Sequence, residues 1–315
     1  MAIETTSQLP VTAQLISYIA RRWPWWKGRT KILQCFDAAL GQRNDYVCTT
    51  LLGSQCRIKV PLDDTVGRKA VAFGENDADL FRFLCAVLAH GASDQDIYVD
   101  IGANLGVFLL RVAERFKIRC IGFEPRIDLA TLMKENIATN NFGTRVEIRN
   151  TAVGSENGQV HLAICPGDSG VTRIGENTNG TLVSLRTLTS EFSPDEWKRV
   201  RVCKIDVEGF ESEVFNGARE LFRLYRPTLV FEVNMEEMQN RGLHPKQLAD
   251  CLREVGYDEF WALDRVLYPI ANGMYPVSNV VAVGTNASAT VKAFGVDMKF
   301  APKAKKFWPI HHFEF

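Results

Sequence analysis

The chain lacks an excess of charge of either sign. It has 315 residues, and its 37 Lys and Arg side chains are balanced by 37 Asp and Glu, so the formal net charge at pH 7 is zero. Proteins that bind nucleic acid usually carry a basic excess or a basic face, because they neutralise phosphates. The balance therefore argues against a nucleic-acid partner. The composition, 46% hydrophobic and 23% charged, is that of an ordinary globular protein.

Two further absences concern metal sites and membranes. The eight cysteines include no Cys-x-x-Cys pair and have no His-rich partner segment, which disfavours a zinc site. No apolar run approaches the roughly 20 residues that span a bilayer, and the N-terminus has no signal-peptide pattern. We expect a reduced, cytoplasmic protein with no integral membrane segment. The sequence does not indicate an oligomeric state.

The character of the chain changes near residue 95. Residues 1–95 are predicted to form an N-terminal α+β extension, residues 96–290 the main domain, and residues 291–315 a C-terminal tail. The extension contains the aromatic and basic segment 23-WPWWKGR-29. Its composition suits a membrane surface or a glycan, although clustered tryptophans more often pack against their own domain.

Strand-like and helix-like segments alternate through the main domain. The strand-like segments are 97–100, 119–124, 145–150, 201–206, 228–233, 258–263 and 278–283. This alternation predicts an α/β fold in which helices cover both faces of a mostly parallel sheet. After the third strand, residues 151–164 are interpreted as a hairpin and residues 165–180 as a loop over the catalytic edge.

Polar side chains stand where five of these strands end. They are Asp100, Glu124, Asn150, Asp206 and Glu232. Ligands of open α/β sheets bind beyond the carboxyl ends of the strands, and a desolvated carboxylate is costly unless it has a partner. We therefore expect the functional site at this edge of the sheet.

The turn after the first strand reads Asp100-Ile-Gly-Ala-Asn-Leu-Gly106. A dinucleotide fingerprint needs a third glycine, and the carboxylate here would repel a phosphate. S-adenosylmethionine suits the turn better, because it has no phosphate and its ammonium group attracts a carboxylate. A turn without a ligand is the alternative. Glu124 can accept hydrogen bonds from the ribose of either cofactor.

Together these segments resemble the FkbM-type family of S-adenosylmethionine-dependent methyltransferases. The shared segments are 99-VDIGANLG-106, 122-GFEP-125, 152-AVG-154, 204-KIDVEGFE-211, 217-GA-218 and 226-RPTLVFE-232. One difference is Leu185-Arg186, where the family commonly has Leu-Asp. The resemblance implies a Rossmann-like class I methyltransferase fold, with a seven-stranded, mostly parallel sheet whose last strand is antiparallel.

The resemblance also implies roles for individual residues. The methionine part of S-adenosylmethionine would be held by Asp100, Gly102, Ala103, Asn104 and Gly106. Glu124, with Pro125 beside it, would hold the ribose, and Ala152 would lie near the adenine. Asp206 is assigned to the cofactor site as well as to catalysis.

Family members often methylate hydroxyl oxygens, so we expect O-methylation of a sugar, glycolipid or other natural product. An aliphatic hydroxyl is a poor nucleophile and needs a general base or a metal. Asp206 or Glu208 is predicted to act as the base, directly or through a divalent cation that Glu232 could share. His244 is a rival base, because histidine titrates near neutral pH. No residue is assigned as a metal ligand outright.

Other interpretations are open. The Asn/Asp-Pro-Pro-Tyr motif is absent, which disfavours methylation of a base or an amide; methylation of a small amine is an alternative. An NAD-dependent oxidoreductase is disfavoured by the missing third glycine. The chain could also be a non-catalytic module that keeps the fold and binds a partner. Finally, Lys204 and Glu208 could form a purely structural ion pair.

Overall fold

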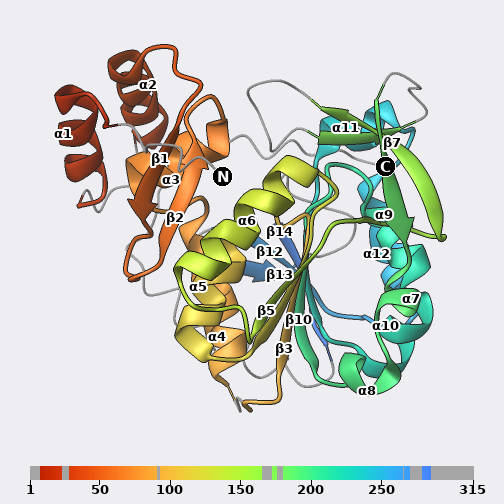
Figure 1. Cartoon of the computed structure of the whole chain (residues 1–315). Coiled ribbons are helices and arrows are strands. Elements are labelled where there is room, and N and C mark those ends of the chain that lie inside the picture. Colours follow the sequence, from red (N-terminus) through yellow and green to blue (C-terminus); the bar gives the residue numbers. More distant parts are fainter. Residues whose placement is uncertain are drawn as a thin grey trace.

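The main domain is built on one sheet of eight strands, which crosses the middle of the molecule in Figure 1. The computed structural model describes residues 8–22, 28–90, 93–164, 172–175, 180–264, 266–269 and 279–284. The strand order is β13–β12–β14–β11–β10–β3–β4–β5. The bounds are β3 (Ile97–Ile101), β4 (Arg119–Phe123), β5 (Val146–Arg149), β10 (Val200–Ile205), β11 (Thr228–Glu232), β12 (Phe260–Asp264), β13 (Val266–Pro269) and β14 (Asn279–Ala282).

The sheet has the predicted directions. Strands β5, β4, β3, β10 and β11 pair in parallel, and the last strand, β14, is antiparallel to both β11 and β12. All seven predicted strands are present, so the predicted fold class is confirmed. The eighth strand, β13, was not predicted and pairs antiparallel with β12. From β3 the chain adds β4 and β5 on one side, and it then crosses over β4 and β3 to add β10 on the other side. The direction of the strand order therefore reverses between β3 and β10, and ligands of such sheets bind at the carboxyl ends of the two strands at this switch point.

Helices cover both faces of this sheet, as Figure 1 shows. Strand residues alternate between two cores: Tyr98, Cys120 and Val202 face one, and Val99, Ile121 and Cys203 face the other. This period-two alternation leaves both faces apolar, as in other buried parallel sheets. The first core receives α4 (Ala78–Ala89), α5 (Val107–Phe116) and α6 (Ile127–Thr139). The second receives α7 (Leu188–Glu191), α8 (Pro194–Trp197), α9 (Glu211–Gly217), α10 (Arg219–Tyr225), α11 (Met235–Asn240) and α12 (Pro245–Arg253).

The N-terminal extension packs beside α5 and α6 (Figure 1). It consists of α1 (Val11–Ala20), α2 (Arg29–Leu40), β1 (Tyr46–Thr50), β2 (Arg57–Pro61) and α3 (Thr65–Phe73). Strands β1 and β2 form an antiparallel pair. Asn136 of α6 ties β2 to the main domain, because its amide bonds the main-chain N–H of Lys59 at 2.7 Å and the carbonyl of Lys59 at 3.0 Å. The predicted boundary at residue 95 stays a prediction, although α4 already packs against α5 and β10.

Two predicted features fall outside the residues that the structure describes. They are residues 23–27 of the aromatic and basic segment, which include its three tryptophans, and the C-terminal tail, 291–315. None of the helices in the described ranges combines the length and the hydropathy that crossing a bilayer requires.

A second, small sheet follows β5. It contains β6 (Ala152–Val153), β7 (Gly158–Ile164), β8 (Thr172–Gly175) and β9 (Thr181–Arg186), in the order β6–β9–β7–β8. The predicted hairpin over residues 151–164 is wrong, because β9 lies between β6 and β7. With only two residues, β6 offers few hydrogen bonds, whereas the six residues of β9 give β7 a longer partner. The predicted loop over 165–180 contains β8, and its residues 165–171 and 176–179 lie outside the described ranges.

Candidate active site

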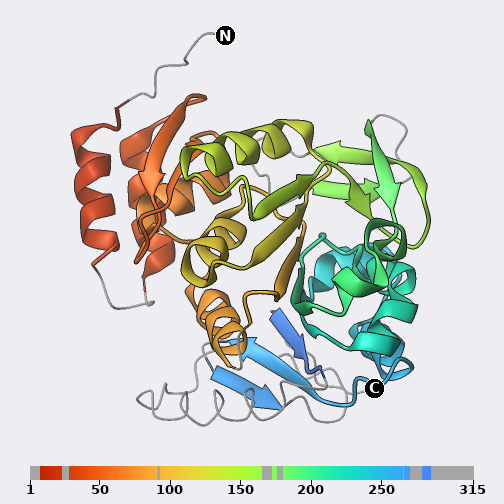
Figure 2. The same cartoon turned by 60° about the horizontal axis from the view of Figure 1, so that its bottom comes forward.

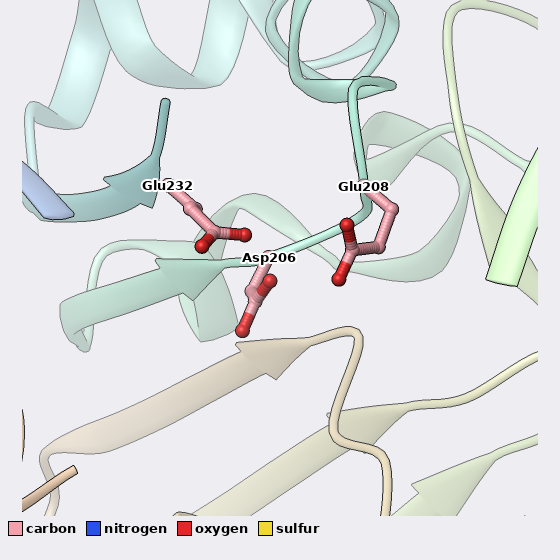
Figure 3. A group of neighbouring side chains, drawn as sticks. All are labelled: Asp206, Glu208 and Glu232. Atoms are coloured by element: carbon pink, nitrogen blue, oxygen red, sulfur yellow. The ribbon is translucent and has the colours of Figure 1, made fainter. Parts of the chain in front are cut away.

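Three carboxylates gather at the carboxyl ends of β10 and β11, as Figure 3 shows. Glu232 is the last residue of β11, while Asp206 and Glu208 lie in the loop that follows β10. One ligand atom from each of the three lies within 4.8 Å of the others. Parallel strands end at the same edge of a sheet, so the strand-end acids predicted from the sequence are brought together here.

Burial and mutual repulsion favour protons on this group. Burial raises the pKa of Glu208 to about 8, and the nearby charges of Asp206 and Glu211 add to the effect. Burial also raises the pKa of Glu232 to about 9, with further contributions from Asp206 and Glu208. Like charges at this separation disfavour simultaneous ionisation. At neutral pH the group therefore holds protons, unless a cation replaces them.

A buried lysine links this group to the first strand. The Nζ of Lys204 lies 3.1 Å from Asp206 Oδ2 and 3.2 Å from Asp100 Oδ1. Burial alone would lower the pKa of Lys204, but the two carboxylates outweigh it and raise that pKa. Burial raises the pKa of Asp100, and Lys204 opposes that shift. Lys204 pairs with these two residues and not with Glu208, so the predicted Lys204–Glu208 ion pair is wrong.

The glycine-rich turn after β3 lies directly against the loop after β10. Gly102 has a φ of +77°, and a Cβ at this position would lie 1.8 Å from the carbonyl oxygen of Asp206. Only glycine allows such an approach. The main-chain N–H groups of Gly102 and Ala103 both donate to the carbonyl of Phe123 at 3.0 Å. Gly106, with a φ of +76°, is the N-cap of α5.

Glu124 stands at the end of β4, on the side of the turn away from β10. Its carboxylate is buried and accepts the N–H of Asn104 at 2.9 Å and that of Arg126 at 3.0 Å. Burial raises its pKa to about 7, and the two main-chain N–H groups oppose that shift. Asn150 donates through Nδ2 to the carbonyls of Glu124 at 2.8 Å and Pro125 at 3.0 Å. Asn150 therefore fixes the backbone around Glu124.

Two other predicted site residues lie away from the strand ends. Ala152 begins β6 and is buried in a small apolar cluster with Leu162, Ile174 and Leu185. His244 is the N-cap of α12, and its Nδ1 accepts the N–H of Lys246 at 3.1 Å. The structure thus gives His244 a helix-capping position. Its proposed role as a base stays a prediction, as does contact of Ala152 with adenine.

Sequence reasoning missed two side chains that support the carboxylate group. Glu211 is buried, and its Oε1 accepts the N–H of Val207 at 3.2 Å and that of Gly209 at 3.4 Å. Asn234 donates to Glu208 Oε2 at 3.2 Å and also caps α11 through Glu237. The Asn-x-x-Glu spacing from Asn234 is a helix-start signal that would have placed this side chain just beyond β11.

Comparison with known proteins agrees with this geometry. Residues 100–259, just over half of the chain, match the model of the methyltransferase FkbM domain. The chain belongs to the FkbM methyltransferase family. The predicted resemblance to these S-adenosylmethionine-dependent enzymes is therefore confirmed, and the match spans Asp100, Glu124 and the carboxylate group.

Individual relatives are more distant. Methyltransferase sdnD of Sordaria araneosa is 26% identical over 213 residues, which are 57% of this chain and 80% of that protein. Methyltransferase FkbM from Methylobacillus flagellatus KT is 15% identical, with a TM-score of 0.42 over 66% of this chain and 55% of that one. This FkbM family member thus spans about half the length of that structure. TYW2 from P. horikoshii, in complex with MeSAdo, is 13% identical, with a TM-score of 0.38 over 80% of each chain.

Proposed function

We propose that this FkbM family member transfers the methyl group of S-adenosylmethionine to a hydroxyl oxygen of a sugar, glycolipid or other natural product. The observation that carries the proposal is the Asp206, Glu208 and Glu232 group, which lies beside the glycine-rich turn. A hydroxyl group must lose a proton when its oxygen is methylated. Burial raises the pKa values of Glu208 and Glu232 above the usual carboxyl range, so each is a stronger base than an ordinary carboxylate and can take that proton once it is itself ionised.

The residues around the turn suit S-adenosylmethionine. Glu124 accepts two main-chain N–H groups, and each carboxylate oxygen keeps acceptor capacity for a ribose hydroxyl. The N–H groups of Gly102, Ala103 and Asn104 already donate within the protein. We therefore assign Gly102, Ala103, Asn104 and Gly106 a role in shaping the turn around the methionine part, more than in donating hydrogen bonds to it.

Asp100 suits an indirect role. Its side chain is 1% exposed, and its Oδ1 is paired with Lys204. The other oxygen, Oδ2, is buried and has no hydrogen-bond partner among the described residues, so an ammonium group of the cofactor would reach this carboxylate only by displacing the side chains around it. Asp100 would instead orient Lys204, and Lys204 would in turn orient Asp206. One buried lysine would thus connect the residue predicted to bind the cofactor with the residue predicted to act as the base.

The reaction is an in-line displacement. As the acceptor oxygen bonds to the methyl carbon, the bond from that carbon to sulfur breaks, and S-adenosylhomocysteine leaves. The acceptor proton passes to Asp206 or Glu208. The methyl group is already activated, so the protein contributes alignment, exclusion of water and proton removal.

A divalent cation is the alternative source of assistance. Asp206, Glu208 and Glu232 offer the carboxylate oxygens that Mg²⁺ and Ca²⁺ prefer. A cation held by them would lower the pKa of the acceptor hydroxyl. Methyl transfer is measured with added Mg²⁺ and in EDTA. Loss of activity in EDTA would favour a bound cation, and equal activity would favour a carboxylate as the base.

Calorimetry with S-adenosylmethionine and with NAD is the first test of this function. The proposal requires binding of the sulfonium compound; binding of NAD alone would make the chain an oxidoreductase. Radiolabelled methyl transfer to hydroxylated and amine acceptors then separates O-methylation from N-methylation. Tight cofactor binding without transfer to any acceptor would favour a non-catalytic module. The cytoplasmic location and the absence of a nucleic-acid partner stay predictions from composition.

A further inference from the structure

The first helix of the extension exposes four of its five large apolar side chains. The residues that α1 buries are small: Ala13, Ser17 and Ala20. Ser17 donates through its hydroxyl to the carbonyl of Val71 at 2.8 Å, which fixes this face against α3. Helices of globular proteins normally bury their large apolar residues and expose the polar ones. In α1, Ile16 alone among the large apolar residues packs against the core, and the others are exposed.

The outer face of α1 consists of Val11, Leu15, Tyr18 and Ile19. Their exposed fractions are 81%, 59%, 57% and 45%. The spacing i, i+4, i+7 and i+8 places them on one side of the helix. They are four of the eight large apolar residues that are exposed in the described part of the chain, so the exposure is concentrated here. Figures 1 and 2 both show α1 at the outer edge of the extension.

The stretch of sequence that contains α1 carries charge of one sign. Residues 5–36 contain five basic side chains and no acidic one, although the whole chain is neutral. Two of the five are occupied within the fold: Arg21 donates to main-chain carbonyls of β1 and α3, and Arg29 pairs with Glu75. Arg22 and Lys31 are exposed and have no acidic partner among the described residues. The guanidinium of Arg22 lies 3.7 Å from the centre of the Tyr18 ring, so this cation lies next to the apolar face.

We propose that the outer face of α1 docks on the surface of a bilayer that contains anionic lipids. Helices that lie in a membrane interface combine an apolar face, aromatic residues and flanking cations. Anionic headgroups complement the unpaired cations, and the acyl boundary takes up the four apolar side chains. A two-fold contact with a second copy would set the same basic surface against itself, which opposes association. The docking is independent of methyl transfer.

Vesicle binding tests this assignment. The full chain is sedimented with vesicles of phosphatidylcholine alone and with vesicles in which about a third of the lipid is phosphatidylglycerol. We expect binding to the anionic vesicles only, weakened by salt. The double variant Leu15→Gln, Ile19→Gln should bind at least about tenfold more weakly, because it removes two apolar anchors. Arg22→Gln with Lys31→Gln should lose roughly tenfold or more.

The control variant is Leu224→Gln on α10, since Leu224 is an isolated exposed side chain with an exposed fraction of 66%. It should bind vesicles like the unchanged chain. Equal binding to both vesicle types, or binding that Leu15→Gln, Ile19→Gln leaves intact, would overturn the proposal. So would a dimer in light scattering that the same double variant dissociates, with no vesicle binding, because the face would then belong to a second copy. Capture of an acidic protein without vesicle binding would likewise replace the membrane as the partner.

Discussion

The ammonium group of Lys204 lies 3.2 Å from a carboxylate oxygen of Asp100, and both side chains are buried. The register of the sheet sets this contact, because Lys204 on β10 stands directly opposite Asp100 on β3. The same ammonium group reaches Asp206 at the end of β10. The end of β3 and the loop after β10 are thus joined through one cation, at the switch point of the sheet.

Replacing Lys204 should destabilise the fold. Lys204→Met leaves the carboxylate of Asp100 buried without its cation, and removal of one partner from a buried pair costs about 3–5 kcal/mol. We expect a loss of about 3 kcal/mol in urea unfolding. The matched control is Lys59→Met, whose pair with Glu135 lies at the surface and should contribute less than about 1 kcal/mol. Equal losses of unfolding free energy from both variants would mean that the buried ion pair stabilises the fold no more than the surface pair does.

The glycine turn offers a sharper comparison. Gly102 and Gly53 both have a positive φ, of +77° and +64°, but only Gly102 has a close neighbour. Gly53→Ala should lose about 1 kcal/mol, the cost of the left-handed backbone alone. Gly102→Ala adds a collision with the Asp206 carbonyl and should lose about 3 kcal/mol or more. It should also weaken S-adenosylmethionine binding in calorimetry, while Gly53→Ala should not.

The strands and the edge that carries the site could be predicted from the sequence because their signals are local. Segments such as 228–233 are apolar on both faces, as a buried parallel strand must be. Their terminal acids are then forced to one edge by the parallel arrangement. Asp206 and Glu232 therefore come together as expected, although 26 residues separate them.

What the sequence did not predict depends on register between distant segments. Residues 151–164 do not specify whether β7 pairs with β6 or with β9, and the longer partner prevails. Lys204 could pair with Glu208, four residues away, or with Asp100, which is 104 residues away. Spacing favours the near residue, but the side chain of Lys204 points toward Asp100 across the sheet. The support from Glu211 and Asn234 also arises only when the loops after β10 and β11 meet.

Turnover should depend on the carboxylate group. Glu208→Gln removes an ionisable group whose pKa is about 8, and loss of a general base costs roughly a hundredfold or more in kcat. Asp206→Asn should behave similarly. Glu236→Gln, an exposed change on the neighbouring α11, should keep normal turnover. His244→Asn keeps a capping oxygen for α12, and we expect it to keep turnover too; a large loss there would return His244 to the list of bases.

The pH profile of kcat/KM follows from the same shifts. A base must be deprotonated to act, and the pKa values of Glu208 and Glu232 are about 8 and about 9. When no divalent cation is bound, kcat/KM should rise from pH 7 toward pH 9. The apparent pKa values of this rise describe the coupled carboxyls together and not one residue. Glu232→Gln should shift the rise to lower pH, because it removes a neighbouring negative charge. A profile that is flat above pH 6 in EDTA would contradict this assignment.

Stability against pH separates protons from a cation at this site. Glu208 and Glu232 have folded pKa values raised from 4.5 to about 8 and about 9, so the folded state binds more protons between these limits. Their contribution to stability is fully present below about pH 4.5 and is lost as pH rises through 8 and 9. Without divalent ions, the free energy of unfolding should therefore fall between about pH 5 and pH 9, and less steeply in the double variant Glu208→Gln, Glu232→Gln.

If a cation binds the three carboxylates, Mg²⁺ or Ca²⁺ should restore stability at pH 9 in the unchanged chain but not in the double variant, by an amount that grows with the logarithm of the ion concentration. A thermal unfolding midpoint that is insensitive to both ions at pH 9 would leave proton transfer to a carboxylate as the mode of assistance.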